Sequence, residues 1–196
     1  DGGAPQLFSI TPKQQQLTMN FDLVDDTSML VHYEFLGRVL GKAVYESILV
    51  EPQFCLPFLN QLMGKLNTLE DLKNYDDEYY NNLNKLRHYK EEEIDNLGLA
   101  FELTVGGTTP NSAPRTVDLV RSGRNIAVTK KNVFQYTQAV ANELLNVLGA
   151  HQTRAFLRGF RDLIPVSWVR LFSAKELQKL ISGDDSVRGI DVPSLK

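Results

Sequence analysis

Cysteine is nearly missing from this sequence of 196 residues, which contains one, Cys55. A single cysteine cannot form a disulfide within the chain, and proteins without disulfides are typical of reducing compartments. We therefore expect an intracellular protein of the cytoplasm, the nucleus or both. Cys55 lies among large apolar neighbours, Phe54 and Leu56, and no basic residue next to it would stabilise a thiolate. This setting predicts a buried structural cysteine rather than a nucleophile.

Long apolar runs and a strong net charge are also missing. No segment approaches the roughly 18 uninterrupted apolar residues of a membrane-spanning helix, so we expect no membrane partner. The net charge of −3 is small and mixed, which argues against a nucleic-acid partner. The start of the chain, residues 1–5, has neither the basic nor the apolar part of a signal peptide.

Groupings of residues that would indicate catalysis are missing as well. His32, His88 and His151 are far apart, and none has a second histidine or cysteine at the spacing of metal ligands, so we expect no metal site and no cofactor. There is no glycine-rich phosphate loop, nucleophile elbow or dinucleotide fingerprint. We expect a chain that has no catalytic centre of its own.

What the sequence does have is clear helical periodicity. Apolar residues recur every three or four positions over 29–50, which predicts a helix with a wide apolar face. Phe35 and Val39 lie outside this stripe and predict burial on more than one side. Gly37 and Gly41 lie one turn apart on the same helix, and the charged residues along this helix exclude a lipid setting. Their spacing predicts that another element approaches the helix backbone closely.

The remaining pattern predicts a small sheet inserted among helices. Residues 1–27 are loop-like with a short strand at 7–10, and residues 91–93, three glutamates, indicate a solvated turn. Alternation of apolar and polar residues predicts a strand at 99–105, with returning strands at 116–120 and 126–128. Capping signals and periodicity predict further helices: at 57–63, after Thr68, at 78–86, after Thr129, at 154–163, and from Ser173 to Gly183.

Two adjacent tyrosines stand out in the acidic stretch before the strands. Tyr79 and Tyr80 lie on a short helix, and Tyr79, Leu83 and Leu86 share one face of it. One interpretation is that both tyrosines pack locally. The other is that they form an exposed aromatic and aliphatic patch, which is the usual anchor of a protein interface.

Four segments taken together resemble the N-terminal lobe of HECT-type ubiquitin ligases. They occur in the order of that family, at 35–45, 126–132, 156–160 and 171–183. Residues 97–99 and the last segment are most similar to family members that lack WW repeats. The sequence departs from the usual pattern at Ala127, where the family has proline, and in the long loop at 106–115.

The resemblance implies an α+β, mainly helical fold. It would consist of a large helical subdomain, residues 1–66 and 146–196, and a small α/β subdomain, residues 67–145. In this family the first lobe docks a ubiquitin-conjugating enzyme (E2), and a separate second lobe carries the catalytic cysteine. No motif of that cysteine occurs here, and the chain stops at Lys196 without a structural end signal. We therefore expect a piece of a larger ubiquitin transferase, inactive alone, whose partners are an E2 and, through the parent protein, ubiquitin.

The resemblance also implies an E2 groove in the small subdomain. It falls on seven residues: Tyr79, Tyr80, Leu83, Leu86, Leu97, Tyr136 and Val140. Val140 stands where the family often has an aromatic residue. Two alternatives remain open, namely a non-catalytic scaffold that has lost E2 binding and an unrelated helical interaction domain. The sequence names neither the E2 nor the substrate.

Overall fold

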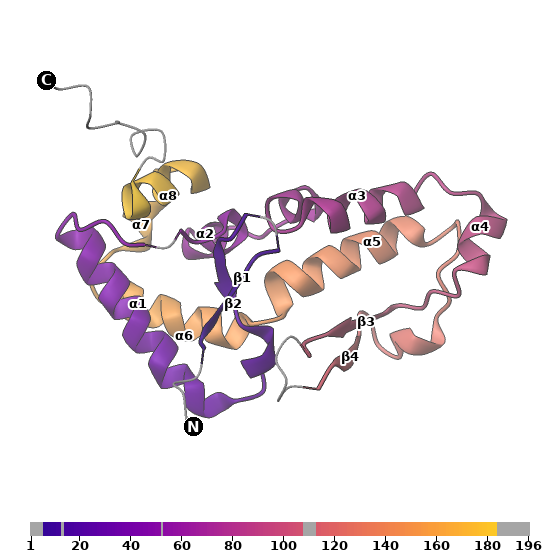
Figure 1. Ribbon diagram of the computed structural model, residues 1–196, viewed down its shortest axis with the longest axis horizontal. Helices are drawn as coiled ribbons and strands as arrows, with labels where there is room; N and C mark the ends of the chain where they lie inside the picture. Colours follow the sequence, from indigo (N-terminus) through magenta and orange to yellow (C-terminus); the bar gives the residue numbers. More distant parts are fainter. Residues whose placement is uncertain (1–5, 13, 52, 108–112, 184–196) are drawn as a thin grey trace, which may run out of the picture.

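The computed structural model describes residues 6–12, 14–51, 53–107 and 113–183, and this part of the chain is mainly helical with two small antiparallel sheets (Figure 1). The α+β class expected from the sequence is therefore confirmed. The α-helices are α1 (Leu30–Tyr45), α2 (Leu56–Leu62), α3 (Asp77–Leu86), α4 (Glu91–Asn96), α5 (Val133–Asn142), α6 (Ala150–Arg161), α7 (Val166–Val169) and α8 (Ala174–Ser182). The strands are β1 (Phe8–Ile10), β2 (Leu17–Met19), β3 (Glu102–Val105) and β4 (Arg115–Asp118). The 3-10 helices are η1 (Phe21–Leu23), η2 (Thr27–Met29), η3 (Leu69–Asn74) and η4 (Gly123–Asn125), and η5 (Glu143–Val147) is a π-helix.

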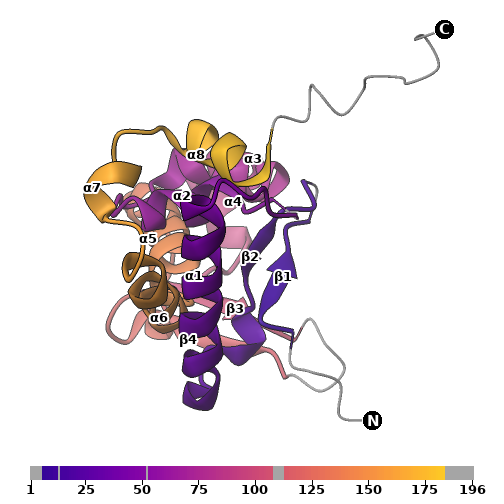
Figure 2. The ribbon, with the colours of Figure 1, turned by 90° about the vertical axis from the view of Figure 1, so that its left-hand side faces the viewer.

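Helices α1 and α6 cross in close contact at one end of the molecule (Figures 1 and 2). A Cβ atom on Gly37 would overlap the backbone carbonyl of Phe156, and one on Gly159 would overlap the carbonyl of Glu34. The close approach predicted from the glycine spacing is therefore confirmed, and its partner is the helix that carries Gly159. Ion pairs flank the crossing, where Arg158 contacts Glu34 at 3.0 Å and Arg38 contacts Asp162 at 2.7 Å.

The outer face of α1 does not match the expectation of burial on more than one side. Phe35 is 58% exposed and Val39 is 47% exposed. The periodicity correctly identified an apolar helix, but only the face toward α6 and the core is covered by residues that the structure describes. The helix also ends at Tyr45, several residues before the expected end.

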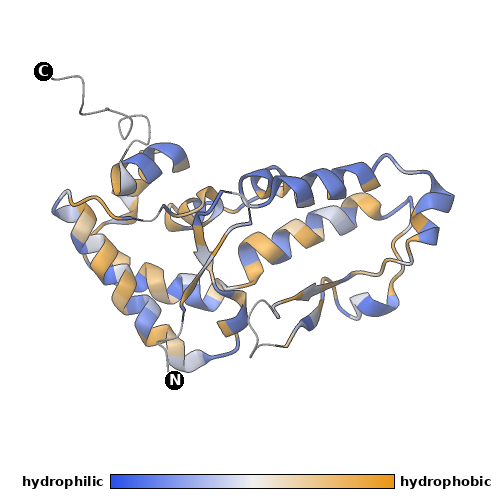
Figure 3. Cartoon of the chain, viewed as in Figure 1, coloured by the Kyte–Doolittle hydropathy of each residue, from blue (hydrophilic) through white to orange (hydrophobic). Residues whose placement is uncertain are grey.

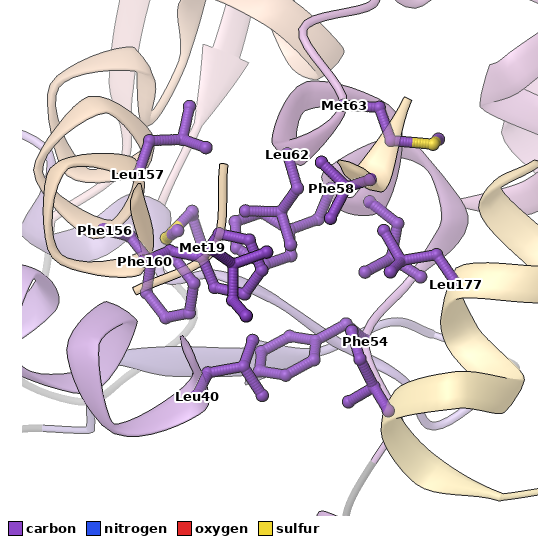
Figure 4. Close-up of a cluster of buried hydrophobic side chains, with 14 of the residues drawn as sticks. Met19, Leu40, Phe54, Phe58, Leu62, Met63, Phe156, Leu157, Phe160 and Leu177 are labelled. Carbon is purple, nitrogen blue, oxygen red and sulfur yellow. The ribbon is translucent and has the colours of Figure 1, made fainter. Parts of the chain in front are cut away.

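A large hydrophobic cluster fills the space beside this crossing (Figure 4). Phe156 lies near its centre, with ring-centroid distances of 5.3 Å to Phe58, 6.0 Å to Phe8 and 6.1 Å to Phe54. The buried members of the cluster lie between Met19 and Met63 or after Ala155 in the sequence.

A second, small hydrophobic cluster lies in the other half of the molecule, among η3, α3, α4, β3 and α5. Its buried members all fall between Leu69 and Leu145. We call the described part of 69–145 the arm, and the rest of the described chain the body. In Figure 3 the α3 ribbon is mostly hydrophilic, whereas α5 carries more hydrophobic residues. The cluster is therefore covered by amphipathic elements rather than by fully apolar ones.

Several local predictions are confirmed in the arm and the body. Pro57 lies in the first turn of α2, and Thr68 and Asp71 form the capping box of η3. Ser173 and Glu176 form the capping box of α8. Strands β3 and β4 pair in antiparallel register, with Leu103 opposite Val117.

Other local predictions are wrong. The glutamates at 91–93 form the first turn of α4 rather than a solvated turn, because acidic residues are favoured at the positive end of a helix dipole. Residues 126–128 contribute a single bridge, Ala127 to Ala100, instead of a strand. Strand β2 lies in a region that was expected to be loop. The helix after Thr129 begins at Val133, with Asn132 as its N-cap.

The glycines of the α1–α6 crossing allow a graded test. Gly37→Ala and Gly159→Ala should each lower the free energy of unfolding by about 1–3 kcal/mol or more, because the new methyl group meets backbone that cannot move aside. Gly41→Ala is the matched control, since its Cβ would lie 3.0 Å from the Phe160 carbonyl oxygen. All three changes gain the same helix propensity, about 1 kcal/mol, so urea unfolding isolates the crossing. Equal stabilities of the three variants would contradict this packing.

Cys55 is buried in the large cluster, as the sequence predicts, with 1% of its surface exposed. Burial raises the pKa of its thiol to about 11. Alkylation by iodoacetamide at about pH 8.5 should therefore be at least roughly a hundredfold slower in the folded chain than in urea, since only the thiolate reacts. Mass spectrometry over time measures both rates. Comparable rates would mean that the thiol is accessible.

Candidate functional site

The arm carries the residues that the resemblance assigns to a docking groove. Helix α3 begins after Asp76, whose Oδ1 atom accepts a hydrogen bond of 2.9 Å from the backbone N–H of Tyr79. Asp77 and Glu78 occupy the first turn, where negative charge is favoured. The cap fixes the start of the helix, and with it the direction in which Tyr79 and Tyr80 project.

Three of the expected groove residues lie in the core of the arm. Leu83 is 4% exposed, Tyr136 is 7% exposed and Val140 is fully buried. The ring of Tyr136 packs edge-on against Phe101 at a centroid distance of 5.5 Å. In this conformation these three side chains support the surface and offer little area to a partner.

Three more of the expected residues pack over that core. Tyr79, Tyr80 and Leu86 are half-buried against the small cluster. Burial raises the pKa of the Tyr79 hydroxyl to about 12. Leu97 lies apart from the cluster at the end of α4 and is 46% exposed. The structure thus gathers six of the seven residues around one core and leaves Leu97 outside it.

Exposed and half-buried side chains lie beside Tyr80. The Tyr80 hydroxyl donates a hydrogen bond of 2.8 Å to Oε2 of Glu70, and this bond raises the pKa of the tyrosine. The Arg87 guanidinium lies 4.6 Å from the centroid of the Phe134 ring, and Phe134 is 53% exposed. An arginine stacked on a ring is held in place at little entropic cost, which is favourable for recognition.

The sequence reasoning did not include Arg87 and Phe134. Phe134 lies off the apolar stripe of its helix, between Val133 and Tyr136. A large aromatic residue on the otherwise polar side of an amphipathic helix was the available signal. The pairing with Arg87 was not accessible, because it depends on how α3 and α5 pack.

Lys130 ties the end of α3 to the start of the α5 region. Its Nζ atom donates hydrogen bonds to the backbone carbonyls of Arg87 (2.9 Å) and Tyr89 (2.6 Å). A cation at the carboxyl end of a helix satisfies carbonyls that have no partner within the helix. This contact fixes the turn that carries Arg87 relative to Phe134.

The composition of this surface and the groups absent from the described residues narrow the chemistry that this part of the chain offers. Among the described residues, no group of three or more histidine, cysteine or acidic side chains could hold a metal ion. No helix in the same residues is long and apolar enough to cross a bilayer. Cys55 lies in the large cluster of the body rather than on the arm. Half-buried tyrosines and a half-buried arginine beside an exposed phenylalanine match the composition of protein interfaces.

Comparison with known proteins identifies one matching family and several similar ligases. The HECT-domain (ubiquitin-transferase) family matches residues 4–196. The chain is 34% identical over 200 residues to the human ubiquitin-protein ligase E3B, an alignment that covers 98% of the chain and 18% of that protein. It is 37% identical over 178 residues to the E3 ubiquitin-protein ligase HUL5 of Saccharomyces cerevisiae, covering 89% of the chain and 19% of that protein. It is 39% identical over 168 residues to the E3 ubiquitin-protein ligase UPL6 of Arabidopsis thaliana, covering 85% of the chain and 16% of that protein.

The chain thus spans about a fifth of the length of these relatives, while the similarity extends over nearly all of the chain itself. Four separate motifs, a mainly helical fold and a family match over 4–196 lead to one assignment. The chain belongs to the HECT-domain (ubiquitin-transferase) family and corresponds to the N-terminal part of that domain.

Proposed function

We propose that this chain is the E2-docking lobe of a HECT-type E3 ubiquitin ligase. The observation that carries the proposal is the family match over residues 4–196, combined with an arm whose tyrosines lie half-buried at the surface. The parent protein would accept ubiquitin from an E2 thioester on a cysteine outside this chain and pass it to a substrate lysine. The lobe itself would bind and position the E2.

In this proposal the two hydrophobic clusters correspond to two subdomains of the lobe. Residues 1–66 and 146–196 would form the large helical subdomain, and residues 67–145 the small E2-binding subdomain. The division agrees with the separation of the clusters, because the small cluster draws its buried members from Leu69 to Leu145. An independent core lets the arm present its surface as a unit.

The proposed docking surface has a supporting layer and a contact layer. Leu83, Tyr136 and Val140 would hold α3 and α5 at a fixed spacing from inside. Tyr79, Tyr80 and Leu86 would contact the E2, and Leu97 would extend the surface past α4. Burying one large side chain of a partner at such a surface contributes roughly 1.5–3 kcal/mol. This magnitude suits weak, reversible docking of an E2 that must leave to be recharged.

One alternative follows from the same geometry. The buried state of Leu83 and Tyr136 is also what a scaffold without E2 affinity would have, since a well-packed core needs no partner. A titration with E2 enzymes distinguishes a docking lobe from a scaffold without E2 affinity.

The docking surface can be tested without disturbing the core of the arm. Leu97→Asp should weaken binding of the chain to its E2 at least tenfold, because a carboxylate replaces an exposed apolar contact and would be buried in the complex. Isothermal titration against a panel of E2 enzymes measures the affinities. Leu83 is unsuitable for this purpose because its truncation would leave a cavity in the core.

The matched control is Leu171→Asp, which makes the same change at a body leucine that is 82% exposed. It should leave the affinity unchanged. Equal losses in the two variants would place the docking surface elsewhere. A folded wild-type chain that binds no E2 in the panel would overturn the proposal in favour of the scaffold.

The chain should not accept ubiquitin itself. A charged E2 incubated with the chain should give no thiol-sensitive ubiquitin adduct, because the Cys55 thiol is buried and its pKa is raised to about 11. Non-reducing electrophoresis with and without dithiothreitol is the measurement. An adduct that disappears in Cys55→Ser would show that this cysteine is a ubiquitin acceptor.

A further inference from the structure

The arm joins the body through two chain crossings. The chain leaves the body between Met63, the last buried member of the large cluster before the arm, and Leu69, the first of the small cluster. It returns between Leu145 and α6. Each crossing contains a glycine with a left-handed backbone, Gly64 at φ +75° and Gly149 at φ +70°. Glycine adopts this conformation without steric cost, so each crossing has, at its body end, a residue with the widest choice of backbone angles.

Asparagine side chains hold the two crossings together. The backbone N–H of Asn67 donates to Oδ1 of Asn146 at 2.9 Å, and Nδ2 of Asn146 donates to the backbone carbonyl of Asn67, also at 2.9 Å. The Asn146 side chain thus satisfies both backbone groups of Asn67 on the other crossing. These two hydrogen bonds join the outgoing crossing directly to the returning one.

Asn67 also ties both crossings to helix α2 of the body. Its Nδ2 atom donates to the carbonyl of Pro57 at 3.0 Å and to that of Leu145 at 3.2 Å. Its Oδ1 atom accepts a bond of 2.9 Å from Asn60. With 6% of its surface exposed, Asn67 is a buried polar residue whose hydrogen-bonding groups are satisfied by the junction.

The π-helix η5 provides the acceptor for this junction. A π-turn widens the helix, and such turns are frequent at functional sites. The carbonyl of Leu145, inside η5, accepts from Asn67 and from Nε2 of Gln61 at 2.6 Å. Gln61 in turn accepts a bond of 3.2 Å from the Thr153 hydroxyl on α6. The return crossing is therefore bonded to α2, and the same glutamine of α2 is bonded to α6.

Arm and body also meet through other contacts. Nδ2 of Asn60 on α2 donates to Oδ1 of Asp71 at 3.2 Å, and Tyr75 packs against both hydrophobic clusters. Arg115 of β4 forms an ion pair with Asp25 at 2.6 Å, but Asp25 is 81% exposed, and such pairs contribute roughly 0–1 kcal/mol. Tyr75 stacks on Phe21 at a centroid distance of 6.4 Å. The ion pair and the ring stack do not fix the angle between arm and body, whereas hydrogen bonds among amides are directional.

We infer that Asn67 and Asn146 are positioning residues, which latch the two crossings and fix the orientation of the arm on the body. Without the latch the arm turns about Gly64 and Gly149, and Tyr75, which packs against both clusters, remains as an apolar contact between arm and body. Whatever docks on the arm is carried with it, so the latch sets the direction in which the docked protein points. This consequence rests on the proposed E2 docking, whereas the latch itself does not.

The latch can be tested by pulsed electron spin resonance on the free chain. Spin labels are attached to cysteines introduced at Glu92 in α4 and Lys175 in α8, both exposed and on opposite sides of the junction. The buried Cys55 stays unlabelled, which a chain without the introduced cysteines verifies. The parent should give one narrow distance distribution. Asn146→Ala should at least double its width, because both bonds to Asn67 are lost.

Asn142→Ala is the matched control. Its side chain accepts a bond of 3.1 Å from Asn146 but makes no bond across the junction. The width should stay at the parental value in this variant. Circular dichroism and thermal unfolding verify that the variants are folded, and Asn146→Ser provides a second, milder change at the latch.

A distribution as narrow as the parental one in folded Asn146→Ala would overturn the inference. Loss of folding in both Asn146 variants would also overturn it, since the residue would then hold the fold rather than an orientation. The measurement contains no E2, so its outcome is independent of the docking proposal. Conversely, a chain that binds no E2 but broadens on Asn146→Ala would retain the latch and lose only the proposed function.

Discussion

The rest of the structure depends on the backbone contact between α1 and α6. Gly37 and Gly159 let the two helices approach until the peptide groups of one touch the Cα of the other. At this separation Phe156 projects into the body and becomes the residue around which the other aromatic rings pack. Helix α6 also begins directly after the return crossing, so its position fixes where the arm leaves the body. A wider crossing would therefore displace both the core and the arm.

Much of this fold could be predicted from the sequence, because its signals are local. The glycine spacing on α1, the capping boxes at Thr68 and Ser173 and the alternation in β3 each follow from geometry within a few residues. The errors arise where a pattern has two physical explanations. Three glutamates suit solvent and also suit the first turn of a helix, and apolar residues such as Phe35 on a second helix face indicate a partner without indicating that the partner is present.

The candidate site also shows that one sequence pattern can have two physical explanations. Periodicity identifies Leu83, Tyr136 and Val140 as apolar-face residues, and the family resemblance assigns them to a groove, but neither distinguishes a groove wall from a core. The structure distinguishes them by exposure, and it buries all three. Phe134 is the opposite case, since it lies off the apolar stripe and the family resemblance does not assign it to the groove. Its exposure beside Arg87 became visible only when α3 and α5 were packed together.

Body and arm are each held by apolar packing, whereas the junction between them combines a buried amide network with the packing of Tyr75 and an exposed ion pair, and the difference has a physical consequence. Separating two apolar surfaces leaves a void or exposes hydrocarbon, at a cost of about 24 cal/mol per Å³ of cavity or 25 cal/mol per Å² of surface. Amide groups that separate regain hydrogen bonds from water, so each lost bond costs a net of roughly 0.5–1.5 kcal/mol. The network of Asn67, Asn146 and Gln61 is thus specific in angle but modest in free energy. A junction of this kind keeps the arm in one orientation, and opening it costs less free energy than disrupting either hydrophobic core.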